Sequence, residues 1–248
     1  MENYFDKSKV ILYPISKEVA RNIIIQNHYS HSWTKCAIAF GVYYREKTNS
    51  FFEENGSERL IGAIVYGDPV GRLVAASVSP LLGQGDVLEL TRLWLADGYG
   101  SNIESYCVGQ TFKYIRKHMV DVKCIISYSD PEAGHKGIIY QALNFLYQGT
   151  ETRKVDSYWY RIDQREGWLH PRTISARYGT TNDDALLKMF PDGFQKREML
   201  RKHRYVLFLR NRNKYISTLT HKILPYPKNE TKLDEVIIQV GGQNESRS

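Results

Sequence analysis

The chain has 248 residues, of which 42% are hydrophobic and 25% are charged. This composition is typical of a folded globular protein and excludes a disordered or fibrous chain. Three cysteines, Cys36, Cys107 and Cys124, are far apart and odd in number, which argues against a disulfide scaffold and favours a reducing cytoplasm. Since hydrophobic runs fall short of a membrane span and charges replace the apolar stretch of a signal peptide, we expect a cytoplasmic protein without a membrane partner.

The formal net charge of +7 is unevenly distributed along the chain. Residues 151–228 hold 17 Lys and Arg against 8 Asp and Glu, whereas the rest of the chain holds 17 against 19. All of the excess positive charge therefore lies in one third of the chain. Such asymmetry predicts a polyanionic partner; the alternative is a basic surface that only keeps the protein soluble.

Hydrophobic spacing predicts an alternation of helices and strands. Ser16 is a typical helix cap, and apolar residues at helical spacing follow it. Two β-rich runs on either side of a polar segment predict a hairpin with a long loop. In chain order we expect a helix at 17–27, hairpin strands at 36–44 and 60–66, a strand at 87–95, a helix at 101–118, a strand at 122–128, a helix at 137–147 closed by Gly149, and strands at 157–162 and 205–209.

The middle of the chain alternates strand, helix and strand, which predicts an α/β fold with a mixed, partly parallel sheet flanked by helices. A basic helical insertion separates the last two predicted strands and is a candidate binding element for the polyanion. The expected division is a catalytic core at 1–162, the insertion at 163–202, a final core strand with a basic segment at 203–228, and a tail at 229–248.

The most informative segment lies at 125–145. A buried strand leads into a polar turn with Asp130 and His135, and then into a helix that carries Tyr140. Ligands of open α/β sheets bind at the carboxyl ends of strands, and the start of the following helix aims unpaired N–H groups at the same place. Two alternatives stay open: Asp130 only caps the turn, and His135 is only a solvated loop residue.

Two histidines, His28 and His31, follow the first predicted helix at a spacing that suits a metal. A third ligand would have to come from Asp130, Glu89 or His135. The candidate metal set is therefore His28, His31 and His135. The alternative is a charged histidine that interacts with the end of the helix.

Three polar residues, Glu89, Thr91 and Arg92, interrupt the otherwise apolar strand at 87–95. A buried carboxylate or guanidinium needs a partner. Either the two charged groups pair with each other for structural reasons, or they face a substrate cleft.

These features together resemble a known family. The runs HYS at 28–30, LELTRLWL at 88–95 and SYSDPEAGHKGIIYQALNF at 127–145 are similar, in this order, to the phage Mom family of DNA adenine-modifying proteins, and the resemblance spans residues 20–228. The order of elements resembles the GCN5-related N-acetyltransferase (GNAT) fold. The resemblance implies an enzyme that converts adenine N6 in double-stranded DNA to a methylcarbamoyl (acyl-type) adenine, which protects phage DNA from host restriction in the bacterial cytoplasm.

The resemblance also implies site residues. It points to Asp130 and Tyr140, and to His28 and Tyr29, as catalytic residues, to which we add Glu89 from the interrupted strand. Asp130 is the candidate that accepts a proton from the adenine amine, and Tyr140 would donate a hydrogen bond to the acyl group or the leaving group. Because a paired adenine cannot reach such a pocket, base flipping is implied.

An acetyl-CoA or related acyl donor, and iron, are the cofactors that the resemblance suggests. The turn at 96–102 would cradle the pyrophosphate of CoA at a helix start. This turn departs from the acetyltransferase pattern, because it lacks the basic or amide residue that opens the pattern and carries Asp97 instead. The candidate cofactor residues are Gly98, Gly100, Ser101, Asn102 and Asn144.

The insertion supplies the expected contacts to DNA. Residues 171–190 have the pattern of two short helices around a glycine turn, which is compatible with a helix-turn-helix. Basic residues in and after this segment would contact phosphates, which sets affinity without reading sequence. The candidates are Arg172, Arg177, Lys196, Arg197, Arg201, Lys202 and Arg204, followed by Arg210, Arg212 and Lys214.

Three other functions compete with this interpretation. The first is an acetyl-CoA-dependent N-acyltransferase that acts on a protein or a small amine. The second is an adenine-N6 methyltransferase, because Ser129-Asp130-Pro131 is similar to the start of their catalytic motif, although Glu132 and Ala133 do not continue it. The third is a DNA-binding protein without enzymatic activity. Only the Mom-like reading and the methyltransferase predict a chemically altered adenine. The oligomeric state is not predicted.

Overall fold

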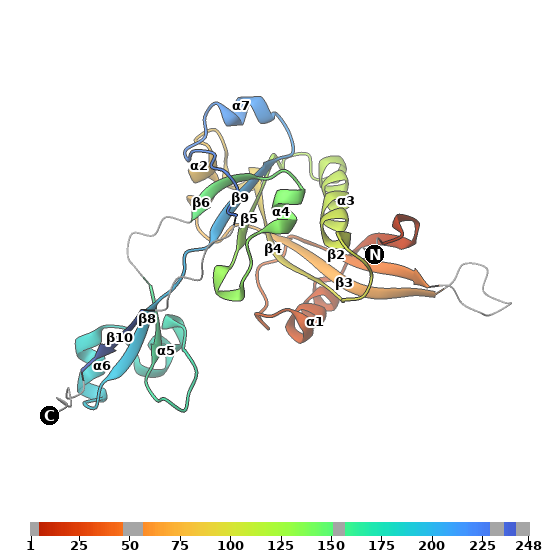
Figure 1. Ribbon diagram of the computed structural model, residues 1–248. Helices are drawn as coiled ribbons and strands as arrows, with labels where there is room; N and C mark the ends of the chain where they lie inside the picture. The colour runs from red at the N-terminus through yellow and green to blue at the C-terminus, as the bar shows by residue number, and fades with distance from the viewer. Residues whose placement is uncertain (1–4, 47–56, 151–156, 229–235, 242–248) are drawn as a thin grey trace. The chain divides into compact units, whose positions relative to one another are not determined.

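The computed structural model describes residues 5–46, 57–150, 157–228 and 236–241. The chain forms two compact units (Figure 1). The first unit comprises residues 1–150 and 202–226, and the second comprises 151–201 and 227–248. Among the described residues, no helix is long and apolar enough to cross a bilayer.

A seven-stranded mixed sheet forms the centre of the first unit, in the order β1-β2-β3-β4-β5-β9-β6. β4 and β5 run parallel, and the other neighbours run antiparallel. The strands are β1 (Val10–Ile15), β2 (Ile38–Glu46), β3 (Ser57–Gly67), β4 (Val87–Leu95), β5 (Cys124–Ser129), β6 (Leu146–Thr150) and β9 (His203–Phe208). The predicted α/β class with a partly parallel sheet is confirmed.

Helices cover both faces of this sheet, because alternate strand residues are apolar on each side. On one face, α3 (Ile103–His118) and α4 (Ile138–Ala142) pack against a cluster that includes Ile64 and Ile125. On the other face, α1 (Lys17–Asn27) packs against Val65. Further along that face, α2 (Val74–Val78) and α7 (Arg212–Ile216) join the cluster around Ile126. Three short 3-10 helices lie at Lys7–Lys9, Gln84–Asp86 and Pro131–Ala133.

One predicted helix is shorter than expected. The helix expected at 137–147 ends at Ala142, and β6 takes over the rest of the segment. Asn144 adopts a left-handed backbone with φ of 58°, which reverses the chain direction and turns Phe145 into the core. Gly149 therefore lies within β6 and does not close a helix.

The second unit has its own three-stranded sheet, in the order β10-β8-β7, and its own apolar core around Ile174 and Leu186. The predicted strand at 157–162 belongs to this unit and not to the first, and the expected tail contains a strand. The elements are β7 (Tyr158–Arg161), α5 (Pro171–Tyr178), α6 (Asp183–Met189), β8 (Phe194–Glu198) and β10 (Ile237–Val240).

The parallel pair β4 and β5 separates halfway along its length. Pairing runs from Val87 with Cys124 to Leu90 with Ser127 and then stops. Beyond this point β4 continues beside β3, while β5 continues beside β9. Thr91 is the extra residue of a bulge opposite β3, and bulges bend the strand that carries them. The separation places the ends of β4 and β5 on either side of one site.

We expect Gly62→Ala to destabilise the sheet next to this separation. A Cβ at Gly62 would lie 2.4 Å from the carbonyl oxygen of Trp94, in the backbone of β4. Overpacking of this kind costs about 1–3 kcal/mol of unfolding free energy. Gly85→Ala is the control, because a Cβ there meets no atom within 4 Å. Chemical denaturation measures both variants, and equal stability of the two would contradict the packing described.

Candidate active site

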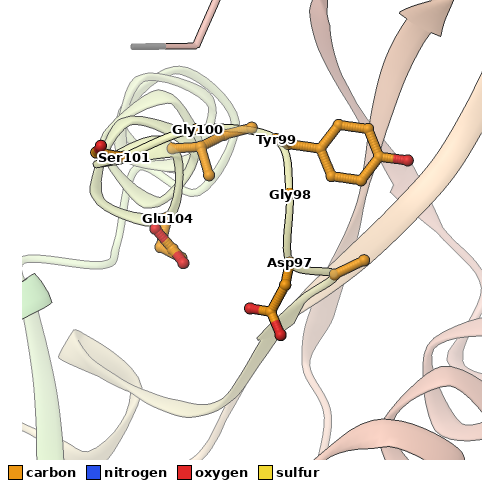
Figure 2. A pocket seen from close by; sticks show the side chains of 8 residues that line it. Asp97, Gly98, Tyr99, Gly100, Ser101 and Glu104 are labelled. Carbon is orange, nitrogen blue, oxygen red and sulfur yellow. The ribbon is translucent and has the colours of Figure 1, made fainter. Parts of the chain in front are cut away.

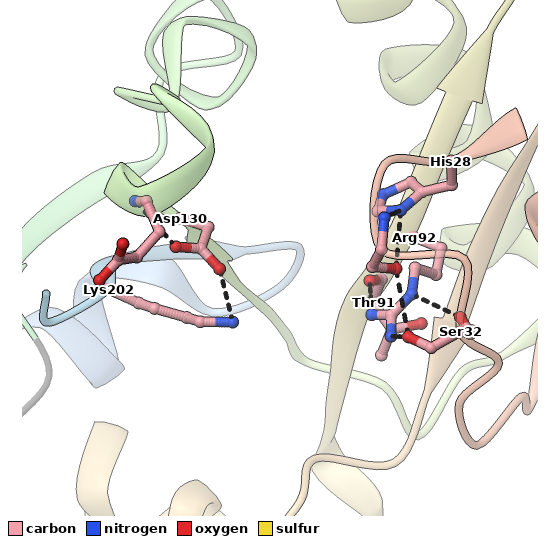
Figure 3. Close-up of polar contacts among 8 residues, drawn as sticks. His28, Ser32, Thr91, Arg92, Asp130 and Lys202 are labelled. Carbon is pink, nitrogen blue, oxygen red and sulfur yellow. Dashed lines mark hydrogen bonds and ion pairs between the residues drawn. The ribbon is translucent and has the colours of Figure 1, made fainter. Parts of the chain in front are cut away.

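Asp130 follows β5 directly, and its two carboxylate oxygens have different partners. Oδ1 accepts a hydrogen bond of 3.1 Å from the Glu132 N–H, so the residue does cap the turn that follows. Oδ2 lies 3.2 Å from Nζ of Lys202, at the start of β9 (Figure 3). The Asp130 side chain is 18% exposed. Asp130 can therefore cap the turn through Oδ1 and take part in a site through Oδ2.

The ion pair corrects the expectation for Lys202. The sequence suggested a phosphate contact, but the Lys202 ammonium lies at the carboxyl end of β5 and pairs with Asp130. The reason is register, because Ser129 pairs with His203 in the antiparallel β5–β9 ladder. Lys202, one residue before His203, therefore lies opposite Asp130, one residue after Ser129.

Tyr140, a candidate catalytic residue, lies on α4. Its helix starts after Gly137, which has a φ of +72° and where a Cβ would lie 2.5 Å from the Tyr205 ring. Burial raises the pKa of Tyr140 to about 12, and the hydrogen bond with Ser127 only partly offsets this, while Tyr29 and Glu89 add to the increase. Because the Ser127 hydroxyl donates its proton to the Leu90 carbonyl, Tyr140 is the donor in this hydrogen bond. Tyr140 therefore keeps its proton at neutral pH.

His28 lies at the end of α1 and is only 7% exposed. Its Nδ1 accepts a hydrogen bond of 3.1 Å from the Ser30 N–H, which assigns the proton of the neutral ring to Nε2. Burial lowers the pKa of His28 to about 4, and the charges of Arg92, His135 and His31 act in the same direction. At neutral pH the ring is therefore an uncharged donor through Nε2.

Tyr29 joins the end of α1 to the turn after β5. Its ring contacts His28 at a centroid distance of 4.3 Å and meets His135 edge-on at 5.0 Å. Tyr29 is 52% exposed, and the carboxylate of Asp130 contributes, after burial, to raising its pKa. An accessible ring thus stands beside the acid of the site.

Arg92 and Glu89 extend the site along β4. Arg92 donates to the Ser32 carbonyl at 3.1 Å, to the Ser32 hydroxyl at 3.0 Å and to the Thr91 carbonyl at 2.7 Å (Figure 3). Burial raises the pKa of Glu89, against a hydrogen bond from the Val70 N–H and the charges of Arg92 and Lys202. Both residues therefore belong to the same group of charges as Asp130, and Arg92 fixes the segment after α1.

The predicted metal set does not come together. Among the residues that the structure describes, no group of three or more His, Cys, Asp and Glu side chains is placed to hold a metal ion. Nδ1 of His28 is occupied by the Ser30 N–H, and His31 bonds the Ile25 carbonyl through its own Nδ1 at 2.9 Å. His135 contacts Tyr29 instead. The described residues therefore do not fit an iron site.

The turn between β4 and α3 forms a pocket of about 280 Å³ (Figure 2). The predicted residues Gly98, Gly100 and Ser101 line it, whereas Asn102 and Asn144 are not part of its lining. Its charged groups are the carboxylates of Asp97 and Glu104, and the eight lining residues include no cation. Carboxylates repel phosphate oxygens, so this lining does not fit the pyrophosphate of CoA.

Most of the residues of the second unit that were predicted to contact phosphates interact with other side chains of the protein. Arg177 donates to both carboxylate oxygens of Glu166, at 3.1 and 3.0 Å, and Lys196 pairs with Asp183. Arg197 lies over the ring of Trp168 at 5.2 Å. Arg172 is exposed in the first turn of α5 and Arg201 is half-buried, so both predictions stay untested.

The expected helix-turn-helix has an unfavourable charge. α5 and α6 form on either side of Gly179, as predicted, but α6 begins with Asp183 and Asp184. Two carboxylates at the start of a recognition helix would repel the DNA backbone. The two helices instead contribute to the core of the second unit, since Ile174 of α5 and Leu186 of α6 are fully buried.

The excess positive charge lies after the insertion. Residues 151–201 hold 10 basic and 8 acidic residues, whereas 199–229 hold no Asp or Glu. Arg204, expected at a phosphate, is 6% exposed and donates to the Ser77 hydroxyl at 3.0 Å. Burial in the β9 register removes it from the surface. The exposed cations of this segment in the first unit are Arg212, Lys214 and Lys222.

With this geometry established, comparisons with known proteins identify the family. The sequence profile of the Mom protein family matches residues 9–228. The chain belongs to the Mom protein family. A relative, the methylcarbamoylase Mom of Escherichia phage Mu, is 27% identical over 219 residues, which cover 86% of this chain and 82% of the relative.

Solved structures similar to this Mom family member include acetyltransferases. NAA60 of Arabidopsis thaliana in complex with acetyl-CoA has a TM-score of 0.44 at 10% identity and covers 80% of this chain and 99% of that one. A spermidine N-acetyltransferase of Vibrio cholerae in complex with CoA and spermine has a TM-score of 0.43 at 10% identity and covers 85% and 99%. The strand order β1-β2-β3-β4-β5-β9-β6, with β4 and β5 parallel, defines the fold of the first unit.

The structure adds two groups to the candidate site that the sequence analysis of this family member did not place there. Lys202 was assigned to DNA, because only the β5–β9 register brings it to Asp130. The Val70 N–H, which lowers the pKa of Glu89, is a backbone group without a sequence signal. Arg92 was noted as a polar interruption of β4, and its role in holding Ser32 needed the structure.

We expect the imidazole of His28 to titrate near pH 4 instead of 6.5. Since its pKa is lower in the folded state, protonation favours unfolding, and stability falls as pH drops from 6.5 towards 4. NMR titration of the ring measures the midpoint, and unfolding as a function of pH measures the linkage. His28→Gln should flatten this part of the stability profile relative to His118→Gln, which removes an exposed histidine of α3. A His28 midpoint near 6.5 would refute the buried neutral ring.

Proposed function

We propose that this protein is a DNA-modifying transferase that converts adenine N6 in double-stranded DNA to a methylcarbamoyl (acyl-type) adenine and so protects phage DNA from host restriction. The observation that carries the proposal is the convergence of Asp130, Tyr140 and the His28-Tyr29 pair in a chain of the Mom family. Tyr29 contacts the rings of His28 and His135, and the His135 N–H bonds the Asp130 carbonyl at 3.0 Å, which links the end of α1 to the turn after β5.

Asp130 acts as the general base on the adenine amine. The lone pair of N6 is delocalised into the purine ring, so the amine is a weak nucleophile until its proton is withdrawn. A carboxylate that accepts the N–H bond takes this proton as the new bond to N6 forms. Oδ2 is suited to this step, because its partner Lys202 is a flexible, 42% exposed side chain, whereas Oδ1 is held by the Glu132 backbone.

Tyr140 and His28 supply hydrogen-bond donors. Tyr140 keeps its proton at neutral pH, and neutral His28 carries its proton on Nε2. Two uncharged donors in a half-buried site stabilise negative charge that develops on a carbonyl oxygen or a leaving group. This division assigns proton acceptance to Asp130 and charge stabilisation to the other two residues.

Tyr29 is the residue that we assign to stacking on the extruded adenine. Base-flipping enzymes hold the extruded base against aromatic side chains. Tyr128, an aromatic residue of β5, packs against the cluster under α2, whereas Tyr29 is 52% exposed and next to His135 in the turn that carries Asp130. The transferred group comes from a donor, for which acetyl-CoA or a related acyl donor is the proposal. Because an acetyl group lacks the nitrogen of a methylcarbamoyl group, acetyl-CoA alone would give N6-acetyladenine, and the methylcarbamoyl product needs a related donor whose acyl group already carries that nitrogen. Since the β4–α3 pocket does not fit a pyrophosphate, no residue there is assigned to it.

Duplex DNA is the proposed partner, and the basic segment of the first unit supports it. Arg212 and Lys214 on α7 and Lys222 beyond it are exposed in a stretch without acidic residues. Contacts from such side chains to phosphates provide affinity that is independent of sequence and sensitive to salt. These residues replace Arg204 and Lys202 in the expected interface.

Asp130→Asn and Tyr140→Phe should abolish modification of a plasmid that is expressed together with the protein. The first removes the base and the second removes the phenolic donor, and both keep the size of the side chain. We expect at least about a hundredfold loss, as for other general acid–base groups. Mass spectrometry of digested nucleosides measures the heavier deoxyadenosine.

Asp121→Asn is the matched control, because Asp121 is an exposed carboxylate in the segment before β5, away from Asp130. Unmodified deoxyadenosine from folded wild-type protein would refute the proposed function. Full modification by Asp130→Asn would refute the role of the carboxylate.

Replacing Arg212 and Lys214 by alanine should weaken duplex binding and lower the slope of log affinity against log salt by about 1 to 2. Arg177→Ala should change neither, because that guanidinium is paired with Glu166. Fluorescence anisotropy of a labelled duplex across a salt series measures both quantities. An unchanged slope in the double variant would place the DNA elsewhere.

A further inference from the structure

The loop at 68–73 presents two large apolar side chains to solvent beside the active site. It connects the end of β3 to the start of α2 and has the sequence DPVGRL. Val70 is 66% exposed and Leu73 is 76% exposed, and Arg72 stands between them in the chain as an exposed cation. Single exposed apolar residues are common on protein surfaces, so their setting decides whether these two have a function.

Both ends of the loop are fixed. At its start, Gly67 lies so close to the backbone of Lys35 that a Cβ would come within 2.1 Å of the Lys35 carbonyl oxygen. At its end, the Leu73 carbonyl accepts the first hydrogen bond of α2, from the Ser77 N–H at 2.8 Å. α2 is held in turn by buried Val78. The apolar side chains are therefore presented from a defined backbone.

The loop starts beside one of the charged residues of the site. Gly67, the residue before the loop, pairs with Glu89 in the β3–β4 ladder. Against the effect of burial, the Val70 N–H and the charges of Arg92 and Lys202 lower the pKa of the Glu89 carboxylate. Lys202 in turn pairs with Asp130. The exposed apolar side chains therefore belong to a loop that begins next to Glu89.

We propose that Val70 and Leu73 form a wedge that enters the base stack of duplex DNA where the target adenine leaves it, while Arg72 contacts the neighbouring phosphate. The inference rests on the proposed function and adds to it the means of extruding the base. The interior of a base stack is apolar and its rim is anionic, so two apolar side chains beside one cation match both parts. Apolar side chains of Val and Leu size are the kind that proteins insert between base steps.

The wedge acts on the extruded state of the DNA. An extruded base leaves a gap whose neighbours have lost stacking, and this loss opposes extrusion. Val70 and Leu73 fill the gap and restore contact, so they favour the extruded state without touching the reacting atoms. They are positioning residues, and their loss should matter least when the target base is already unpaired.

The test uses the full-length protein and a duplex that carries 2-aminopurine at an adenine found to be modified in co-expressed plasmid. The fluorescence of 2-aminopurine increases when the base leaves the stack, and this readout needs no carbon donor. We expect Val70→Ala with Leu73→Ala to reduce the increase at saturating protein about tenfold, in proportion to the lost stabilisation of the extruded state. A second duplex places an abasic site opposite the probe, and there the variant should reach the wild-type signal.

Val120→Ala is the matched control, because Val120 is 63% exposed between α3 and β5, at the opposite end of β5 from Asp130. Wild-type fluorescence of the Val70 and Leu73 double variant on the paired duplex would overturn the wedge. An equal loss on both duplexes would also overturn it, because it would indicate damage to the site and not to extrusion. Failure of the proposed function is a different result, namely unmodified deoxyadenosine in plasmid from wild-type cells.

Discussion

The structure depends on the parting of two parallel strands. β4 and β5 share a ladder only as far as Leu90 and Ser127, and the bulge at Thr91 turns β4 towards β3. An unbroken ladder would bury the ends of both strands. The separation instead leaves Asp130 on one side and Arg92 on the other, and the end of α1 supplies His28 and Tyr29. Each group of the proposed mechanism comes from a segment that borders this separation.

The site contains two kinds of group: charged side chains that form ion pairs, and hydrogen-bond donors that are neutral. Lys202 faces Asp130, while burial keeps His28 uncharged and Tyr140 protonated at neutral pH. A proposed base with one oxygen in an ion pair with an exposed lysine, together with donors that carry no charge, suits transfer to a weak nucleophile. The distribution also explains why the β4–α3 turn is not part of the mechanism, since its carboxylates disfavour an anionic ligand.

Local patterns predicted much of the fold, and long-range register decided the rest. Ser16 as a cap and the apolar spacing behind it correctly indicated α1, and the interrupted run at 87–95 correctly indicated β4. The helix expected at 137–147 failed, because one left-handed residue, Asn144, outweighed the helical pattern. Arg204 and Lys202 are both basic residues of one segment, yet only pairing with β5 shows that one is buried and the other meets Asp130. A count of charged residues in the segment cannot show which of Lys202 and Arg204 is buried.

The connections of the second unit have an evolutionary consequence. The chain leaves the sheet after Thr150 and returns before His203, and these two residues are direct partners in the β6–β9 ladder. Partners in such a ladder lie only about 5 Å apart. A segment whose entry and exit are adjacent can be lengthened, shortened or replaced without shifting any strand of the sheet. Recombination at this junction would exchange residues 151–202 on an unchanged seven-stranded sheet, provided that the new segment still pairs with β10 from the C-terminal part of the second unit.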